Sequence, residues 1–286
     1  MLIAHPDDYR YLPALSAIRL NTQFVRAVLE GEVTGRVWVD QLPEPRVAHA
    51  MHPYGMSFIW GECDDERIPS LADHLLLGAY RKHDEWLQIA PSMSHLPWNE
   101  LLNAVPGNDG QAPGGQRVQR YERVNFQFEP ERFFARNPEA PPLPAGWRLR
   151  PMTVDEFDLP DVSVSPRAFW HNATQFLARG GGWCADINGE IGTIVFTSFR
   201  THGSLEIGVE TRGEHRGKGL AHAAAATFLK ELVDKKAQPV WSCRRENVAS
   251  YELAIRLGFT PVRTVPYFRL PASSASAAPA SWSMIA

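Results

Sequence analysis

Residues 204–229 read SLEIGVETRGEHRGKGLAHAAAATFL, and this stretch decides the fold of the second half of the chain. Over 204–210 apolar side chains alternate with acidic or small ones, which is the pattern of a strand with two different faces. From residue 220 onward strong helix formers carry apolar side chains at helical spacing. The stretch therefore predicts a strand, a turn and a helix. One face of the strand holds Leu205, Ile207 and Val209, and the other holds Glu206, Gly208 and Glu210.

The predicted turn combines glycines with basic residues. Gly213, Gly217 and Gly219 precede the helix, and glycines let successive main-chain amides approach a ligand without obstruction by side chains. Those amides and the positive end of the helix dipole favour an anion such as phosphate. Arg216 and Lys218 add cationic donors. The turn is therefore a candidate phosphate site.

Two common phosphate signatures do not fit this turn. A P-loop needs Ser or Thr after its lysine, and Lys218 is followed by Gly219. A dinucleotide fingerprint follows the first strand of its unit, whereas this turn follows a later one with different glycine spacing. The order that remains is Arg-x-x-Gly-x-Ala over 216–221.

A second motif lies about 30 residues further along the chain. It reads WSCRRENVASYELAIRLGF over 241–259. Together the two motifs resemble the GCN5-related N-acetyltransferase (GNAT) superfamily, over roughly 147–270. In the second motif the matching residues are Asn247, Ser250, Leu253, Gly258 and Phe259. The whole chain looks similar to two-part bacterial members with an extra N-terminal half.

The resemblance implies an α/β fold of the α+β type, a mixed sheet flanked by helices. It also implies acetyl-CoA as cofactor. The strand 204–210 would part from the strand 239–243 to admit the pantetheine arm, and the turn would hold the diphosphate. The cofactor-binding residues implied in this way are Val209, Glu210, Thr211, Arg216, Gly217, Lys218, Gly219, Leu220, Ala221, Asn247 and Ser250.

Transfer to an amine needs a base, because an alkylammonium has a pKa of about 10 and its nitrogen is nucleophilic only when neutral. Glu206 and Glu210 share the strand face that would line the opening. We expect Glu206, which is mid-strand and better shielded, to be the base, with Glu210 as the second candidate. The competing interpretation is that either carboxylate simply faces solvent.

The departing sulfur needs a proton. In the superfamily a tyrosine seven residues after the motif asparagine often supplies it, and here that position holds Ala254. Ser250 and Tyr251 on the same predicted helix are the substitutes, in that order of preference. Alternatively, Ser250 only binds cofactor and Tyr251 packs into the core.

The function expected is acetyl-CoA-dependent N-acetylation by direct transfer in a ternary complex. A small-molecule amine is preferred over a protein as the acceptor. The alternative is a catalytically inactive acyl-CoA sensor or partner-binding module, for which Ala254 is the argument. A nucleoside-triphosphate enzyme is disfavoured by the missing Ser or Thr after Lys218.

Composition sets the class of protein. The chain has 286 residues, which suggests about two domains. A formal net charge of −3 argues against binding to nucleic acid or to a membrane surface. Three scattered cysteines and an acidic N-terminus without a signal-peptide pattern favour a cytoplasmic protein. No metal site is expected, and a homodimer stays open.

A proline-rich segment marks the expected boundary between the two domains. NPEAPPLPAG at 137–146 holds four prolines and predicts an extended linker. It separates an N-terminal α/β domain, 1–136, from the acetyltransferase domain, 147–270, and a small-residue tail, 271–286, is expected to be disordered. The N-terminal half shows a similar order of elements and is a candidate degenerate GNAT-like copy. Helices are expected over 9–29, 70–83, 98–104, 165–179, 219–236 and 248–257, and strands over 36–40, 56–62, 86–90, 117–128, 147–151, 183–187, 191–199, 204–210, 239–243 and 262–270.

The remaining chemical residues favour structural roles. Cys243 on a predicted strand is expected to be a core residue. The set His49, His52 and Cys63 lacks the paired spacing of a metal site. The aromatic residues of 169–183 are expected in the core, with a role in an acceptor pocket as the alternative.

Overall fold

The computed structural model describes residues 1–15, 18, 20–107, 117–201 and 203–273. Most of the predicted disordered tail, from residue 274 onward, lies outside this part of the chain. The chain forms two compact units. The first comprises Met1–Arg123 and the segment that begins at Thr264, and the second comprises Val124–Arg263. The expected linker at 137–146 carries no helix or strand, and the domain boundaries drawn there stay a prediction.

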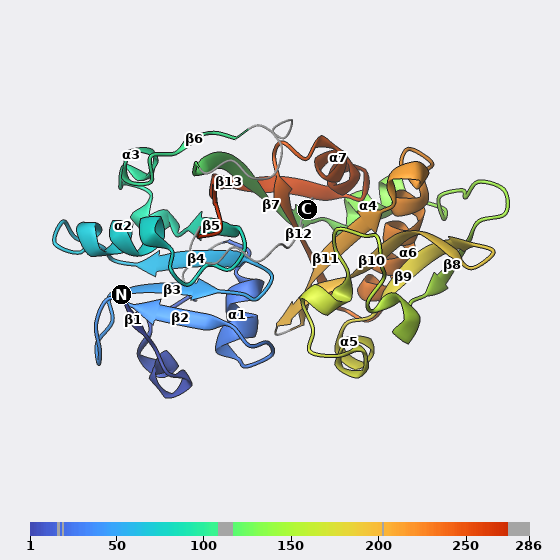
Figure 1. The fold of residues 1–286 in the computed structure, drawn as a ribbon. Coiled ribbons are helices and arrows are strands. Elements are labelled where there is room, and N and C mark those ends of the chain that lie inside the picture. The colour runs from blue at the N-terminus through green and yellow to red at the C-terminus, as the bar shows by residue number, and fades with distance from the viewer. Residues whose placement is uncertain (16–17, 19, 108–116, 202, 274–286) are drawn as a thin grey trace. The chain divides into compact units, whose positions relative to one another are not determined.

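The first unit contains a sheet in which β1 to β5 come early in the chain and β13 comes last (Figure 1). Its order is β1-β2-β3-β4-β5-β13. Neighbours are antiparallel, except that β4 and β5 are parallel. The helix α2 connects these two parallel strands. The elements are β1 (Leu2–Ile3), η1 (Pro6–Tyr11), α1 (Gln23–Leu29), β2 (Arg36–Val39), β3 (Val47–Met51), β4 (Met56–Gly61), α2 (Ile68–Leu77), β5 (Glu85–Ile89), η2 (Pro91–Met93), α3 (Trp98–Leu101), β6 (Val105–Pro106) and β7 (Gln119–Phe128).

The second unit repeats this plan. Its strands follow the order β8-β9-β10-β11-β12, antiparallel except for the parallel pair β11 and β12. The helix α6 connects that pair, as α2 does in the first unit. The elements are α4 (Pro130–Arg136), β8 (Arg148–Pro151), η3 (Val154–Glu156), η4 (Pro166–Ala168), α5 (Ala173–Arg179), β9 (Gly182–Ile187), β10 (Glu190–Thr201), β11 (Ser204–Thr211), η5 (Gly213–His215), α6 (Leu220–Asp234), β12 (Gln238–Arg244), α7 (Val248–Arg256) and β13 (Phe259–Leu270).

The expected mixed sheet flanked by helices is therefore confirmed, and the first unit repeats the strand order of the second. Each unit also takes residues from the other half of the sequence. The end of β13, from Tyr267 to Leu270, pairs with β5 of the first unit. In the second unit Val124, Phe126 and Phe133 join the hydrophobic core.

Apolar burial explains where the helices lie. The helix α6 packs against β9, β10, β11 and β12, and its Ala224, Ala225 and Phe228 are buried with Leu205 and Ile207 of β11 (Figure 1). The alternation predicted for β11 is thus confirmed on its apolar face. In the part of the chain that the structure describes, every helix is too short or too polar to cross a membrane.

Two elements of the first unit differ from the expectation. Within the described residues of 9–29, where one helix was expected, the structure has η1, which ends before Pro13, and α1; Pro13 lacks the amide that a continuous helix would need. The strand β3 was not expected, since Arg46 and His49 interrupt the apolar pattern of a strand. All five residues of β3 are nevertheless buried.

His49 is buried because a polar network surrounds it. Its Nε2 lies 2.9 Å from Glu85 Oε1 and its Nδ1 lies 3.0 Å from His74 Nε2. The Glu85 carboxylate also accepts hydrogen bonds from Ser57 (2.6 Å) and Tyr80 (2.8 Å). Buried polar groups are tolerated when they are bonded in this way. Both ring nitrogens of His49 are therefore bound within this buried network.

The first unit should lose stability in mild acid. Burial lowers the pKa of His52 to about 3 and that of His74 to about 3. The unfolded chain takes up protons on these imidazoles below about pH 6.5, whereas the folded chain does not. The free energy of unfolding should therefore fall by up to about 1.4 kcal/mol per pH unit for each group, between about pH 6 and pH 5.

Urea unfolding followed at pH 7, 6 and 5 measures this slope. The variant His52→Gln should have a smaller slope than the wild type, and exposed His95→Gln should leave it unchanged. Equal slopes in the wild type and His52→Gln would contradict the assignment.

Candidate functional site

The strand β11 presents two carboxylates on the face opposite the α6 core. Glu206 is 5% exposed and Glu210 is 6% exposed. Both therefore need polar partners. Ser242 of β12 donates a hydrogen bond of 2.8 Å to Glu206 Oε1. Ser163 donates one of 2.6 Å to Glu210 Oε2. Both carboxylates are therefore buried and hydrogen-bonded, and the alternative expectation that either of them faces solvent is wrong.

The environment of Glu210 favours its neutral form. Burial raises the pKa of Glu210 above the usual value of a glutamate, while the hydrogen bond from Ser163, the charge of Arg216 and the Thr211 amide act in the opposite direction. The Arg216 guanidinium lies 3.7 Å from Glu210 Oε1. A carboxylate with a raised pKa is a stronger base than an exposed glutamate.

The pairing of β11 with β12 is short. It runs from Ser204 opposite Gln238 to Glu206 opposite Val240. On its other edge β11 stays paired with β10 as far as Thr211. Within the described residues, the second half of β11 is thus bonded to β10 but outside the β12 ladder. This agrees with the expectation that the two strands part, and Glu206 stands where they do.

The turn between β11 and α6 leaves main-chain amides available. Gly217 and Gly219 have φ values of +74° and +79°, a region in which side chains are strained. A Cβ atom on either glycine would meet nothing within 4 Å. Among the described residues, the amides of 217–221 donate no hydrogen bond. Because α6 has 15 residues, its dipole adds partial positive charge at this end.

Cationic side chains flank these amides. Arg216 Nε donates a hydrogen bond of 3.1 Å to the Thr211 carbonyl. Lys218 Nζ lies 3.0 Å from His215 Nδ1, and His215 Nε2 lies 2.7 Å from Glu190 Oε1. Since an ammonium can only donate, His215 accepts at Nδ1 and donates from Nε2 to Glu190. The imidazole thereby holds Lys218 beside the turn.

The residues Glu190, Glu214 and His215 offer oxygen and nitrogen atoms within 4.8 Å of one another. Such a group could ligate a metal ion in principle. Both ring nitrogens of His215 already have protein partners, Glu190 and Lys218. We therefore describe this group as a hydrogen-bonded cluster at the base of the turn.

The candidate residues on and just before α7 have different surroundings. Asn247 Oδ1 caps α7 by accepting from the Ser250 amide at 3.1 Å. Ser250 Oγ accepts a hydrogen bond of 3.2 Å from Trp241 Nε1, which leaves its own proton free to donate. The Tyr251 ring packs 5.3 Å from Phe126 and against the core, and Ala254 is fully buried there.

The structure brings some predicted residues together and leaves others apart. Glu210 and Arg216 are neighbours. Ser242 lies on the Glu206 face of the sheet, whereas the adjacent Trp241 points into the core and contacts Ser250. The preferred base and the preferred acid are therefore oriented by neighbouring residues of β12 that point to opposite faces.

Sequence reasoning missed the partners of the carboxylates. Ser242 follows the paired residue Val240 by two positions, so a known register of β11 and β12 could have found it. Ser163 lies in an irregular segment with no periodic signal. Glu190 and His215 each precede or follow a glycine turn and carry no recognised motif.

The aromatic segment and Cys243 are core residues. Phe169 packs 5.8 Å from Phe196 and 5.2 Å from Phe199, and Phe176 packs 6.4 Å from Phe196. These rings cover the face of β10 away from α6. Cys243 is fully buried in the core of the second unit.

Comparisons with known proteins agree with this arrangement. The family model described as GNAT acetyltransferase matches residues 16–268. An uncharacterized N-acetyltransferase of Bacillus subtilis, YdfB, is 23% identical over 245 residues, which cover 84% of this chain and 87% of that protein.

Two solved structures share the fold over nearly the whole chain. A GCN5-related N-acetyltransferase-like protein from Streptococcus suis has a TM-score of 0.63 at 20% identity and covers 93% of this chain and 99% of its own. A tandem GNAT protein from the clavulanic acid biosynthesis pathway has a TM-score of 0.57 at 13% identity, covering 98% and 99%. The family match spans both compact units, and on that ground this chain belongs to the GNAT acetyltransferase family.

Proposed function

We propose that the chain is an acetyl-CoA-dependent N-acetyltransferase that acts on a small-molecule amine by direct transfer in a ternary complex. The observation that carries this proposal is the turn at the start of α6, where the amides of 217–221 have no acceptor among the described residues. The open space beside Gly217 and Gly219 leaves room for an anion there.

The chain's own residues suit the cofactor. The amides of 217–221 would bind the diphosphate, with Arg216 and Lys218 as charged donors. The backbone of Val209–Thr211, outside the β12 ladder, would bind the pantetheine arm. Asn247 already caps α7, so its amide nitrogen is the group left to contact the cofactor. When bound, acetyl-CoA supplies the acyl group.

Glu206 is the proposed base. It lies where β11 and β12 part, and Ser242 orients its carboxylate. Its carboxylate would accept the proton of the acceptor ammonium, after which the nitrogen forms a bond to the acyl carbon as the carbon–sulfur bond breaks. Glu210, with its raised pKa, is the second candidate. Main-chain donors near Val209 would polarise the carbonyl.

Ser250 is the proposed donor of a proton to the departing sulfur. Its hydroxyl is oriented by Trp241, whereas the Tyr251 ring is committed to packing against Phe126. Protonation of the sulfur would leave Ser250 deprotonated, and Ser250 would regain its proton from the nitrogen, which loses a second proton as the amide forms. The first proton, taken from the ammonium, would pass from Glu206 to water.

An acyl-CoA sensor without catalysis is the second candidate. The fully buried Ala254 provides no hydroxyl at the position where the superfamily often has tyrosine. Acetyl-CoA binding measured by calorimetry, together with thiol release over a panel of amines, separates the two. Binding with turnover on at least one small amine is expected. Binding without turnover on any amine would favour the sensor, and no binding would contradict both.

The turn itself is tested by two substitutions at one position. Gly219→Ala and Gly219→Asp both place a Cβ atom at a positive φ, where aspartate is strained no more than alanine, but only aspartate adds negative charge and bulk beside the amides. We expect Gly219→Asp to abolish acetyl-CoA binding and Gly219→Ala to weaken it less. Equal affinities of the two variants, measured by calorimetry, would contradict the placement of the diphosphate.

The base is tested by a matched pair on one strand face. In Glu206→Gln the side-chain oxygen still accepts from Ser242, so the fold is kept while the base is lost. We expect kcat to fall by about 10² or more at neutral pH with unchanged acetyl-CoA affinity. The kcat of Glu210→Gln should fall less than that of Glu206→Gln. A normal pH–rate profile for Glu206→Gln would remove Glu206 from the mechanism.

The acid is tested on α7. Ser250→Ala should lower kcat, whereas Tyr251→Phe keeps the ring against Phe126 and should leave kcat near the wild-type value. Acetyl-CoA affinity of both variants, measured alongside, separates catalysis from binding. A drop confined to affinity in Ser250→Ala would make Ser250 a binding residue only.

A further inference from the structure

The first unit contains a segment with the same topology as the proposed cofactor site of the second unit. The β4, α2 and β5 segment of the first unit has the same order and the same parallel pairing as β11, α6 and β12 of the second. The turn of 212–219 in the second unit therefore corresponds to the turn of 62–67 in the first. Any difference between the two turns reports on whether the first unit can hold the same cofactor.

The charges of the two turns differ in sign. The turn of 62–67 reads ECDDER, with four acidic residues, one base and no glycine. Its base, Arg67, is already bound to carboxylates, because Nε lies 2.7 Å from Asp40 Oδ2 and NH1 contacts Asp64. The carboxylates of the turn of 62–67 would repel a diphosphate. Arg216 and Lys218 in the turn of 212–219 would attract one.

The first turn of α2 is also a poorer donor. Its N-cap, Arg67, has α-helical dihedrals (φ −89°, ψ −22°), so the chain enters the helix without the left-handed glycines found before α6. Pro69 stands in the first turn and has no amide hydrogen. One of the donors that a phosphate would need is thus missing.

The strands of the first unit do not part. β4 and β5 pair from Met56 opposite Trp86 to Ile59 opposite Ile89. Beyond that, the Ala90 amide donates to the Ile59 carbonyl at 2.8 Å. Ser92 Oγ donates to the Gly61 carbonyl at 3.0 Å, at the last residue of β4. A pantetheine arm would have to displace these bonds.

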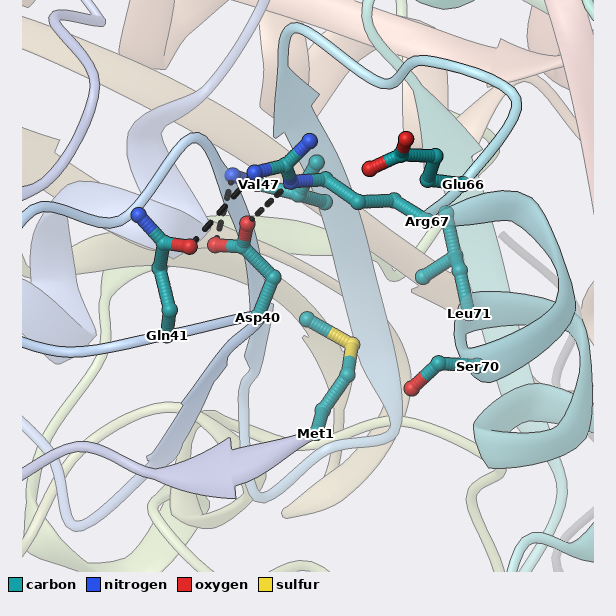
Figure 2. A pocket seen from close by; sticks show the side chains of 8 residues that line it. All are labelled: Met1, Asp40, Gln41, Val47, Glu66, Arg67, Ser70 and Leu71. Atoms are coloured by element: carbon teal, nitrogen blue, oxygen red, sulfur yellow. Dashed lines mark hydrogen bonds and ion pairs between the residues drawn. The ribbon is translucent and has the colours of Figure 1, made fainter.

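A pocket of about 220 Å³ does lie at the start of α2, but its polar groups suit no phosphate. Figure 2 shows Asp40 and Gln41 turned toward Arg67, whose guanidinium they engage. Glu66 adds a further carboxylate to the lining, with Ser70 as a neutral neighbour.

We propose that each chain binds one acyl-CoA, in the second unit, and that the first unit is a structural repeat that does not bind the cofactor. This inference rests on the proposed function for its ligand. What it adds to the proposed function is the number of cofactor sites on each chain and the unit that holds them. It assigns the first unit no part in a second round of acyl transfer.

Calorimetric titration of the full chain with acetyl-CoA tests the number of sites. One molecule per chain is expected for the wild type, none for Gly219→Asp, and one for Asp65→Asn, whose substitution lies in the turn of the first unit. Two molecules per chain, or one that remains in Gly219→Asp, would overturn the inference. No binding by the wild type would instead overturn the proposed function and the inference with it.

Two measurements guard against misfolding and locate the site. Lys218→Glu changes charge without a positive φ and should also lose binding, with thermal unfolding like that of the wild type. Hydrogen exchange with and without acetyl-CoA should slow in peptides that span 213–222 and stay unchanged in those that span 62–71. Slowing in the 62–71 peptides would place cofactor on the first unit and contradict the proposal.

Discussion

The main-chain amides at the start of α6 are the constraint around which the second unit is organised. Five consecutive amides, 217–221, donate no hydrogen bond within the described residues, at the positive end of a helix of 15 residues. Unsatisfied donors concentrated at one point are stabilised by an anion, and two of these residues, Gly217 and Gly219, have left-handed φ values and no side chain to obstruct one. The strand, the turn and the helix therefore bring these donors together at one point, which is where we propose that the diphosphate binds.

The carboxylates on β11 set a second condition on the same site. Glu206 and Glu210 are both buried, and buried carboxylates are costly unless hydrogen bonds or cations compensate. Ser242 and Ser163 provide the hydrogen bonds, and Arg216 provides a charge near Glu210. Compensation is incomplete at Glu210, where burial raises the pKa. A raised pKa makes this carboxylate a stronger base than an exposed glutamate.

Local patterns were predictable and long-range partners were not. The alternation in β11 and the glycine turn involve residues close in sequence, so the order of residue types alone places the strand, the turn and α6. Ser163 is separated from Glu210 by 47 positions in the chain, and the local sequence around Ser163 gives no signal for their hydrogen bond. The strand β3 was missed for a related reason. His49 is buried only because Glu85 and His74, distant in sequence, bind its ring nitrogens.

The two units share one topology but differ in the turn that leads into the connecting helix. Both units place a helix between two parallel strands, yet one connecting turn is basic and rich in glycine while the other is acidic. A crystal structure of the chain with coenzyme A tests the placement of the diphosphate most directly. We predict phosphate oxygens within hydrogen-bond distance of the amides of 217–221. Electron density for the diphosphate anywhere else on the chain, with those amides bound to protein or water, would contradict it.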